Sequence, residues 1–81
     1  MNIAFERTCL NAARTRAYQE KMNPASERQV QSMLFFMNRT GKTASDVGLS
    51  MFDTGAFLSK ARANQLIASL AEELVCGKEV A

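Results

Sequence analysis

Apolar side chains recur at helical spacing in two stretches of the chain, and a glycine-containing connection separates these stretches. The first stretch carries Val30, Met33, Leu34 and Met37. The second carries Ala63, Leu66, Ile67, Leu70 and Leu74. Residues at i, i+3, i+4 and i+7 lie on one side of a helix that has about 3.6 residues per turn. The pattern therefore predicts two amphipathic helices whose apolar faces bury each other.

A further helix is predicted over residues 3–22, which contain neither glycine nor proline and are rich in good helix formers. The apolar side of this helix consists of Phe5, Cys9, Leu10, Ala12, Ala13 and Ala17. Most of these side chains are small. Apolar burial contributes about 25 cal/mol per Å², so small side chains contribute little. We therefore expect this helix, within residues 1–22, to be the most weakly attached part of the fold.

The boundary between the first two helices lies at Asn23-Pro24, because the residue before a proline disfavours the α conformation. The second helix, expected over residues 24–40, has two candidate N-caps. These are Asn23 and Ser26, the latter in a capping box with Gln29. Gly41 is expected to end this helix.

The last helix is expected over residues 59–75, with Ser59 as its N-cap and an end at Gly77. The segment before it is predicted to form one short helical turn near residues 43–49. Its apolar residues should fold back onto the helices: Leu49, Met51, Phe52, Phe57 and Leu58. The expected fold is thus an all-α bundle of three main helices in a single domain of residues 1–81, with a frayed tail at 78–81.

Composition narrows the class of protein. With 81 residues the chain is near the lower limit for folding on its core alone, and its net charge of +2 is too positive for an acidic DNA mimic. Cys9 and Cys76 have no metal-motif spacing and are expected to be reduced thiols. Glu6 and Arg7 interrupt any signal-peptide pattern, and no apolar run approaches a membrane span. We expect a cytoplasmic protein without a membrane partner.

The chain contains no histidine. It therefore lacks the Ser-His and Cys-His nucleophile pairs and the commonest transition-metal ligand. The candidate carboxylates carry no recognisable pocket signature: Asp46, Asp53, Glu72 and Glu73. The sequence therefore predicts a protein that is not an enzyme, with neither cofactor nor metal.

Basic residues recur every seven positions on the polar side of the first helix, drifting by about 20° each time. This side carries Arg7, Asn11, Arg14, Tyr18 and Lys21. Such a stripe suits a phosphate backbone, with the tyrosine stacking on a base. The alternative is an ordinary solvated face that nearby Glu6 and Glu20 partly neutralise, and the sequence leaves both interpretations open.

The charges of the last helix oppose its dipole, at about 0.3 kcal/mol or more per charge. Lys60 and Arg62 are in its first turn, whereas Glu72 and Glu73 are near its end. A first turn with free N–H groups, a serine and two cations is a candidate site for an anion or an acidic patch. The alternative is that packing against other elements supplies the counter-charges.

Residues 26–70 resemble a small helical module of phage and mobile-element accessory proteins, of which the Mu-phage GemA-type proteins are one group. The residues that carry the resemblance are Ser26-x-x-Gln29, Met33-Leu34, Arg39-x-Gly41, Asp46, Leu58-Ser59, Ala63, Leu66-Ile67 and Leu70. The resemblance implies a non-enzymatic accessory to DNA transactions or host takeover in a bacterial cytoplasm. It transfers no binding residue.

The patterns predict a small binding module, and the resemblance implies that it is a regulatory protein that binds and modulates a bacterial protein of the DNA-handling or host-defence machinery. Its predicted contact residues are Lys60, Arg62, Arg7, Arg14, Tyr18 and Lys21. Two alternatives stay open. One is direct nucleic-acid binding by the same residues, and the other is a structural homo-oligomer held by exposed methionine and phenylalanine side chains.

Overall fold

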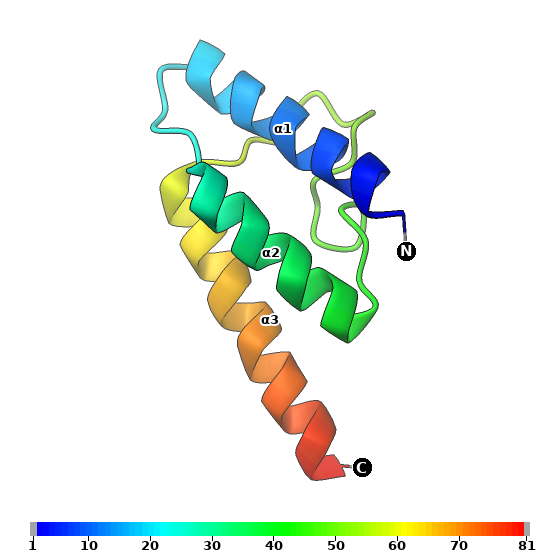
Figure 1. Ribbon diagram of the computed structural model, residues 1–81. Helices are drawn as coiled ribbons and strands as arrows, with labels where there is room; N and C mark the ends of the chain where they lie inside the picture. Colours follow the sequence, from blue (N-terminus) through cyan, green and yellow to red (C-terminus); the bar gives the residue numbers. More distant parts are fainter. Residues whose placement is uncertain (1, 81) are drawn as a thin grey trace.

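The computed structural model describes the backbone of residues 2–80 and the side chains of residues 2–75. Within that range the chain forms three helices: α1 (Ile3–Gln19), α2 (Glu27–Thr40) and α3 (Lys60–Val80). Helices α2 and α3 lie side by side and run in the same direction, and α1 runs roughly opposite to α2 (Figure 1). The segment 41–59 returns the chain from the end of α2 to the start of α3. The predicted all-α bundle is confirmed.

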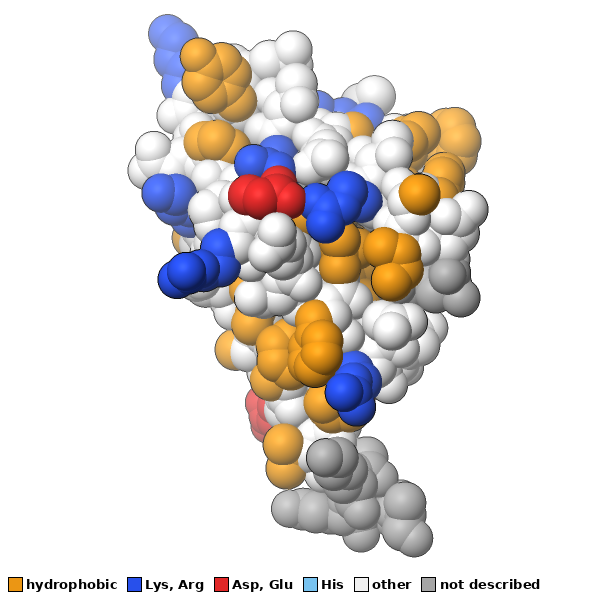
Figure 2. Space-filling model, viewed as in Figure 1, with side chains coloured by type: hydrophobic (Ala, Val, Ile, Leu, Met, Phe, Trp, Pro, Cys, Tyr) orange, Lys and Arg blue, Asp and Glu red, His pale blue; other side chains and the backbone are white. Residues whose placement is uncertain are grey.

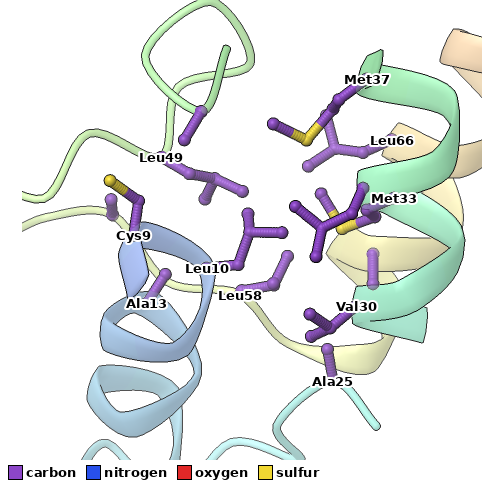
Figure 3. Close-up of a cluster of buried hydrophobic side chains, with 14 of the residues drawn as sticks. Cys9, Leu10, Ala13, Ala25, Val30, Met33, Met37, Leu49, Leu58 and Leu66 are labelled. Carbon is purple, nitrogen blue, oxygen red and sulfur yellow. The ribbon is translucent and has the colours of Figure 1, made fainter. Parts of the chain in front are cut away.

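The core lies where all three helices and the 41–59 segment meet. All four residues of the predicted α2 stripe are buried, and so are three of the α3 stripe: Ala63, Leu66 and Leu70. Leu10 of α1 and Leu49 and Leu58 of the connecting segment complete the core. Figure 3 shows Leu10 pointing between the buried side chains of α2 and those of the connecting segment. The two amphipathic stripes therefore do bury each other, with one large α1 side chain added.

The N-terminus of α2 is fixed by Ser26, not by Asn23. The Ser26 Oγ accepts a hydrogen bond from the Gln29 N–H at 3.1 Å, and the Gln29 Oε1 accepts one from the Ser26 N–H at 2.9 Å. This capping box starts the helix at Glu27, so the expected start at residue 24 is wrong. Pro24 instead forms an isolated antiparallel bridge with Ser59.

Helix α1 ends at Gln19, earlier than the expected residue 22, because Lys21 adopts the left-handed conformation with φ 62°. The Met22 N–H donates to the Ala17 carbonyl at 2.9 Å, and the Lys21 N–H donates to the Tyr18 carbonyl at 3.0 Å. These two bonds form a Schellman motif. Lysine occupies the position that normally favours glycine.

The connecting segment folds back onto the helices as predicted, with one exception. A turn at 44–48 is closed by bonds such as that from the Leu49 N–H to the Ala44 carbonyl at 2.8 Å, and both residues are buried. Phe52, however, is 85% exposed. Its N–H donates to Ser50 Oγ at 3.3 Å within a turn that directs the ring to solvent, so the prediction of a packed Phe52 is wrong.

Helix α3 continues to Val80, past the expected ends at Val75 and Gly77. A glycine inside a helix costs about 1 kcal/mol relative to alanine but keeps its backbone hydrogen bond, so it does not by itself end a helix. The side chains from Cys76 onward lie outside the described residues. The expectations of a reduced Cys76 and of a frayed tail at 78–81 fall there, whereas the Cys9 thiol is free and buried.

Candidate functional site

A carboxylate lies between two of the predicted contact residues. Glu27, the first residue of α2, accepts a hydrogen bond from Arg7 Nη1 at 2.6 Å and another from Arg14 Nη1 at 3.2 Å. Figure 2 shows an acidic group flanked by basic groups on this α1–α2 face. The ion pairs of Arg7 and Arg14 are formed with Glu27 and not with Glu6 or Glu20. The counter-charge of these two arginines comes from another helix.

Arg14 is held rigidly by the start of α2. Its Nε donates to the Ala25 carbonyl at 2.9 Å, and its Nη1 donates to Asn11 Oδ1 at 2.9 Å as well as to Glu27. Only 25% of its side chain is exposed. A guanidinium with several acceptors loses little further freedom when it meets a ligand.

An open hollow of about 430 Å³ lies beside this guanidinium, between α1 and the turn before α2. It is lined by Asn11, Arg14, Thr15, Tyr18, Pro24 and Glu27. Tyr18 stands on its edge and is 71% exposed. The structure thus brings together Arg14 and Tyr18, whereas Arg7 contacts only the far side of Glu27. We call these six lining residues the Tyr18 hollow.

The carboxylate of Glu27 forms a negatively charged part of the lining of the Tyr18 hollow. The hydrogen bond from Arg7 lowers the pKa of Glu27 below its ordinary value of 4.5, and the positive charges of Arg7 and Arg14 act in the same direction. The carboxylate is therefore ionised at neutral pH. The hollow offers an acceptor and a donor side by side.

Lys21 and Lys60 lie at the end of the molecule where the 20–24 turn meets the start of α3. The Lys60 N–H donates to the Asn23 carbonyl at 2.8 Å, and the Arg62 N–H donates to Ser59 Oγ at 3.1 Å. The prediction that Ser59 caps α3 is confirmed. The expectation of free N–H groups in this first turn is wrong at both cations, because these acceptors occupy them.

Arg62 belongs to a different part of the surface. It lines a second hollow, of about 360 Å³, between α3 and the 42–48 turn, with Lys42, Asp46, Val47, Gly48, Leu66, Ser69, Leu70 and Glu73. Lys42 Nζ contacts Glu73 Oε2 at 3.3 Å, so packing does supply a counter-charge to one acidic residue of α3. The backbone N–H of Thr43 lowers the pKa of Asp46 on the same wall.

Sequence reasoning missed Glu6 and Glu27. Glu6 is 4% exposed, and its Oε2 accepts a hydrogen bond from the Ala44 N–H at 3.4 Å. Helical spacing from Leu10 and Ala13 places Glu6 on the buried stripe of α1, and that signal was present in the sequence. The Glu27 contact depends on how α1 crosses α2, so no local pattern predicts it.

Comparison of the chain with protein-family models, with curated proteins and with solved structures finds no match. In the described part of the chain no helix combines the length with the apolar character that crossing a membrane requires. The described residues also contain no group of three or more side chains arranged to hold a metal ion. The site has therefore to be judged on its own geometry.

Proposed function

We propose that this protein is a non-enzymatic docking module that binds another protein through the Tyr18 hollow and the basic residues around it. The observation that carries the proposal is an exposed tyrosine, Tyr18, beside an arginine, Arg14, whose orientation is already fixed. Tyrosine and arginine dominate the energetic centres of protein interfaces. Both present a large contact area without needing much ordering.

The chemistry of the hollow favours a protein over a polyanion. A partner residue that enters it meets the donor Arg14 and the acceptor Glu27 together, which suits amide and hydroxyl groups. A phosphate would meet the ionised carboxylate of Glu27 and would have to break its bonds with Arg7 and Arg14. The net charge of +2 is also small for a nucleic-acid-binding domain.

The resemblance over residues 26–70 supports a narrower proposal for the biological role. We propose that the partner is a bacterial protein of the DNA-handling or host-defence machinery, modulated in the cytoplasm by a phage or mobile-element accessory protein. Lys21 and Lys60 extend the surface beyond the Tyr18 hollow with two exposed cations. Arg62 faces the second hollow and has a smaller part in this contact.

The proposal is tested by capture from bacterial lysate with the immobilised full chain, with and without nuclease treatment. A specific protein should be retained in both conditions. Tyr18→Ala should reduce its retention at least tenfold, whereas Phe52→Ala, which removes a still more exposed ring elsewhere, should leave it unchanged. Equal retention by wild type and Tyr18→Ala would contradict the assignment of the Tyr18 hollow.

The same experiment separates the nucleic-acid alternative, for which the exposed Lys21, Lys60 and Tyr18 at one end of the molecule are the best observation. In that case nuclease should abolish retention, and purified protein should bind DNA at about 50 mM salt with an affinity that falls steeply as salt rises. Retention of DNA with this salt dependence would replace the proposed function. Absence of DNA binding at low salt would exclude the alternative.

A further inference from the structure

On the side away from the 42–48 turn, the surface where α2 and α3 meet is polar near the start of the two helices and apolar further along. Gln29 Nε2 donates to the Lys60 carbonyl and to Asn64 Oδ1 near the start of the pair. On the other side of α3, which faces the 42–48 turn, Lys42 contacts Glu73 near the end of the pair. The separation between Gln29 and Lys60 equals that between Lys42 and Glu73, so the two helices stay level along their shared length.

We call the surface where α2 and α3 meet the seam. Two helical turns after the Gln29 contact, the residues on this seam are apolar. Phe36 lies seven residues after Gln29, and Ile67 lies seven residues after Lys60, so both stay on the seam. Each packs against the core while remaining partly exposed. Phe35 on α2 and Val75 on α3 flank them and are 52% and 56% exposed. We call these four residues the seam patch.

Charges of opposite sign border the seam patch on its two flanks. On the α2 side, the Arg39 guanidinium lies over the Phe35 ring, 5.0 Å from its centroid. On the α3 side, Glu72 is exposed. The register of the pair places Arg39 level with Leu70, within one turn of Glu72. Figure 2 shows hydrophobic side chains over the lower part of the two helices, with basic and acidic side chains at their borders.

Within residues 2–75, neither of these two charges has an ion-pair partner. Among the side chains of residues 2–75, the ion pairs involve Arg7, Arg14 and Lys42, and they do not include Arg39 or Glu72. A cation and an anion at the same level on opposite flanks of an apolar strip form a self-complementary arrangement. A two-fold axis along the strip places each flank of one copy against the other flank of the second.

We propose that the seam patch binds a second copy of this chain in a two-fold symmetric dimer. Arg39 of each copy then faces the partner's Glu72, and the same pair forms twice. The exposed Phe35 and Val75 side chains become covered in this contact, and buried aromatic residues contribute strongly to interfaces. The apolar contact supplies the attraction, and the two charge pairs fix the orientation. The contact is independent of the Tyr18 hollow, which lies between α1 and the turn before α2.

The test is sedimentation of the purified full chain over a concentration series from about 10 µM to about 1 mM, a range that covers weak to moderate affinities. As the concentration rises, the sedimenting mass of the wild-type protein should increase from that of a monomer to that of a dimer. The variants Arg39→Glu and Glu72→Arg should each remain monomeric. In a homodimer of either variant, two pairs of like charges would face each other. An equimolar mixture of the two variants should regain the two-chain mass, because the mixed pair restores attraction at both contacts.

Arg62→Glu is the matched control, since it reverses the same kind of charge on the opposite side of α3 and should still dimerise. Circular dichroism establishes that each variant is folded, and Phe35→Ser provides a second, uncharged way to break the contact. A wild-type protein that remains monomeric at about 1 mM would overturn the proposal. So would single variants that dimerise like wild type, or a mixture that fails to reassociate. The assay contains no other protein, so its failure leaves the proposed function untouched.

Discussion

The α2–α3 pair and helix α1 are held in the molecule by different forces. Between α2 and α3 the contact is a continuous apolar stripe, with Met33 and Met37 fully buried. Helix α1 contributes one large buried aliphatic side chain, Leu10, and its other buried apolar residues are Cys9, Ala13 and Ala17. Apolar burial scales with area, so α1 gains less from it than the pair does.

Polar contacts make up part of this difference. Arg14 reaches the Ala25 carbonyl, Arg16 Nη2 donates to the Met51 carbonyl at 2.6 Å, and Glu6 accepts from the Ala44 N–H. The second guanidinium nitrogen of Arg16, Nη1, is buried without a partner, so this contact is only partly satisfied. The helix bearing the Tyr18 hollow is thus fixed by directional polar bonds in addition to its apolar burial. Its position should respond to charge and pH more than that of the pair.

The largest expected effect comes from removing the apolar anchor of α1. Leu10→Ala should lower the free energy of unfolding by about 3 kcal/mol, because Leu10 is fully buried and its loss leaves a cavity. Urea unfolding measures the loss, and Met33→Ala in α2 is the matched comparison at about the same cost. A loss at Leu10 below about 1 kcal/mol would mean that this side chain is packed less tightly than its full burial indicates.

The next effect concerns the buried carboxylate of α1. Glu6→Ala should cost about 1–3 kcal/mol, because it leaves the Ala44 N–H without its acceptor in a buried position. Glu6→Gln keeps an acceptor oxygen and should cost less. Thermal unfolding of the two variants side by side measures the difference. Identical losses would show that the acceptor oxygen contributes nothing.

A gain in stability is expected at the end of α1. Lys21→Gly should stabilise the protein by about 0.5–1 kcal/mol, since glycine adopts the left-handed conformation without the cost that a lysine bears. The greater entropy of glycine in the unfolded chain offsets part of the gain. Lys21→Ala serves as the control, because it keeps the Cβ and should give no gain. A glycine variant no more stable than the alanine variant would refute the assigned strain.

The smallest expected effect tests the ion pairs of the exposed Glu27. Its pKa is lower in the folded protein than its ordinary 4.5, so its contribution to stability is present above about pH 4.5 and is lost as the pH falls through the folded value. Glu27→Gln lacks this contribution at every pH. The difference in unfolding free energy between wild type and variant should therefore shrink between pH 6 and pH 3, as the standard linkage relation requires.

Asp46 is an internal control for this pH dependence of the unfolding free energy. Its pKa is also lowered, by the backbone N–H and then the hydroxyl of Thr43, and it is present in both proteins. Both should therefore lose some stability in acid, and only the difference between them reports on Glu27. A difference that stays constant across the pH range would show that Arg7 and Arg14 do not stabilise the folded state through this carboxylate.

Local patterns predicted the helices well because helix formation and capping are local. The Val30-to-Met37 stripe, the capping box of Ser26 and the cap of Ser59 depend on residues within a few positions of each other. The left-handed Lys21 was missed because Asn23-Pro24 was a sufficient signal for the helix end. Such a signal ends a helix without fixing the conformation of its last residues.

The candidate site was less predictable because it is assembled from separate elements. Periodicity correctly placed Arg14 and Tyr18 on one side of α1, and both line the hollow. The closing wall comes from Pro24 and Glu27, whose approach depends on the angle at which α1 meets α2. Helix packing of that kind follows from the shapes of many side chains together, so a basic stripe read along one helix gave no sign of its counter-charge.

Native-state hydrogen exchange resolved by residue, at low and at high salt, tests the central comparison most directly. The account predicts that α1 amides open at a lower free energy than those buried in the α2–α3 pair, and that the gap widens with salt as the Glu27 ion pairs are screened. Equal opening free energies for Leu10 and Met33 at both salt concentrations would contradict it.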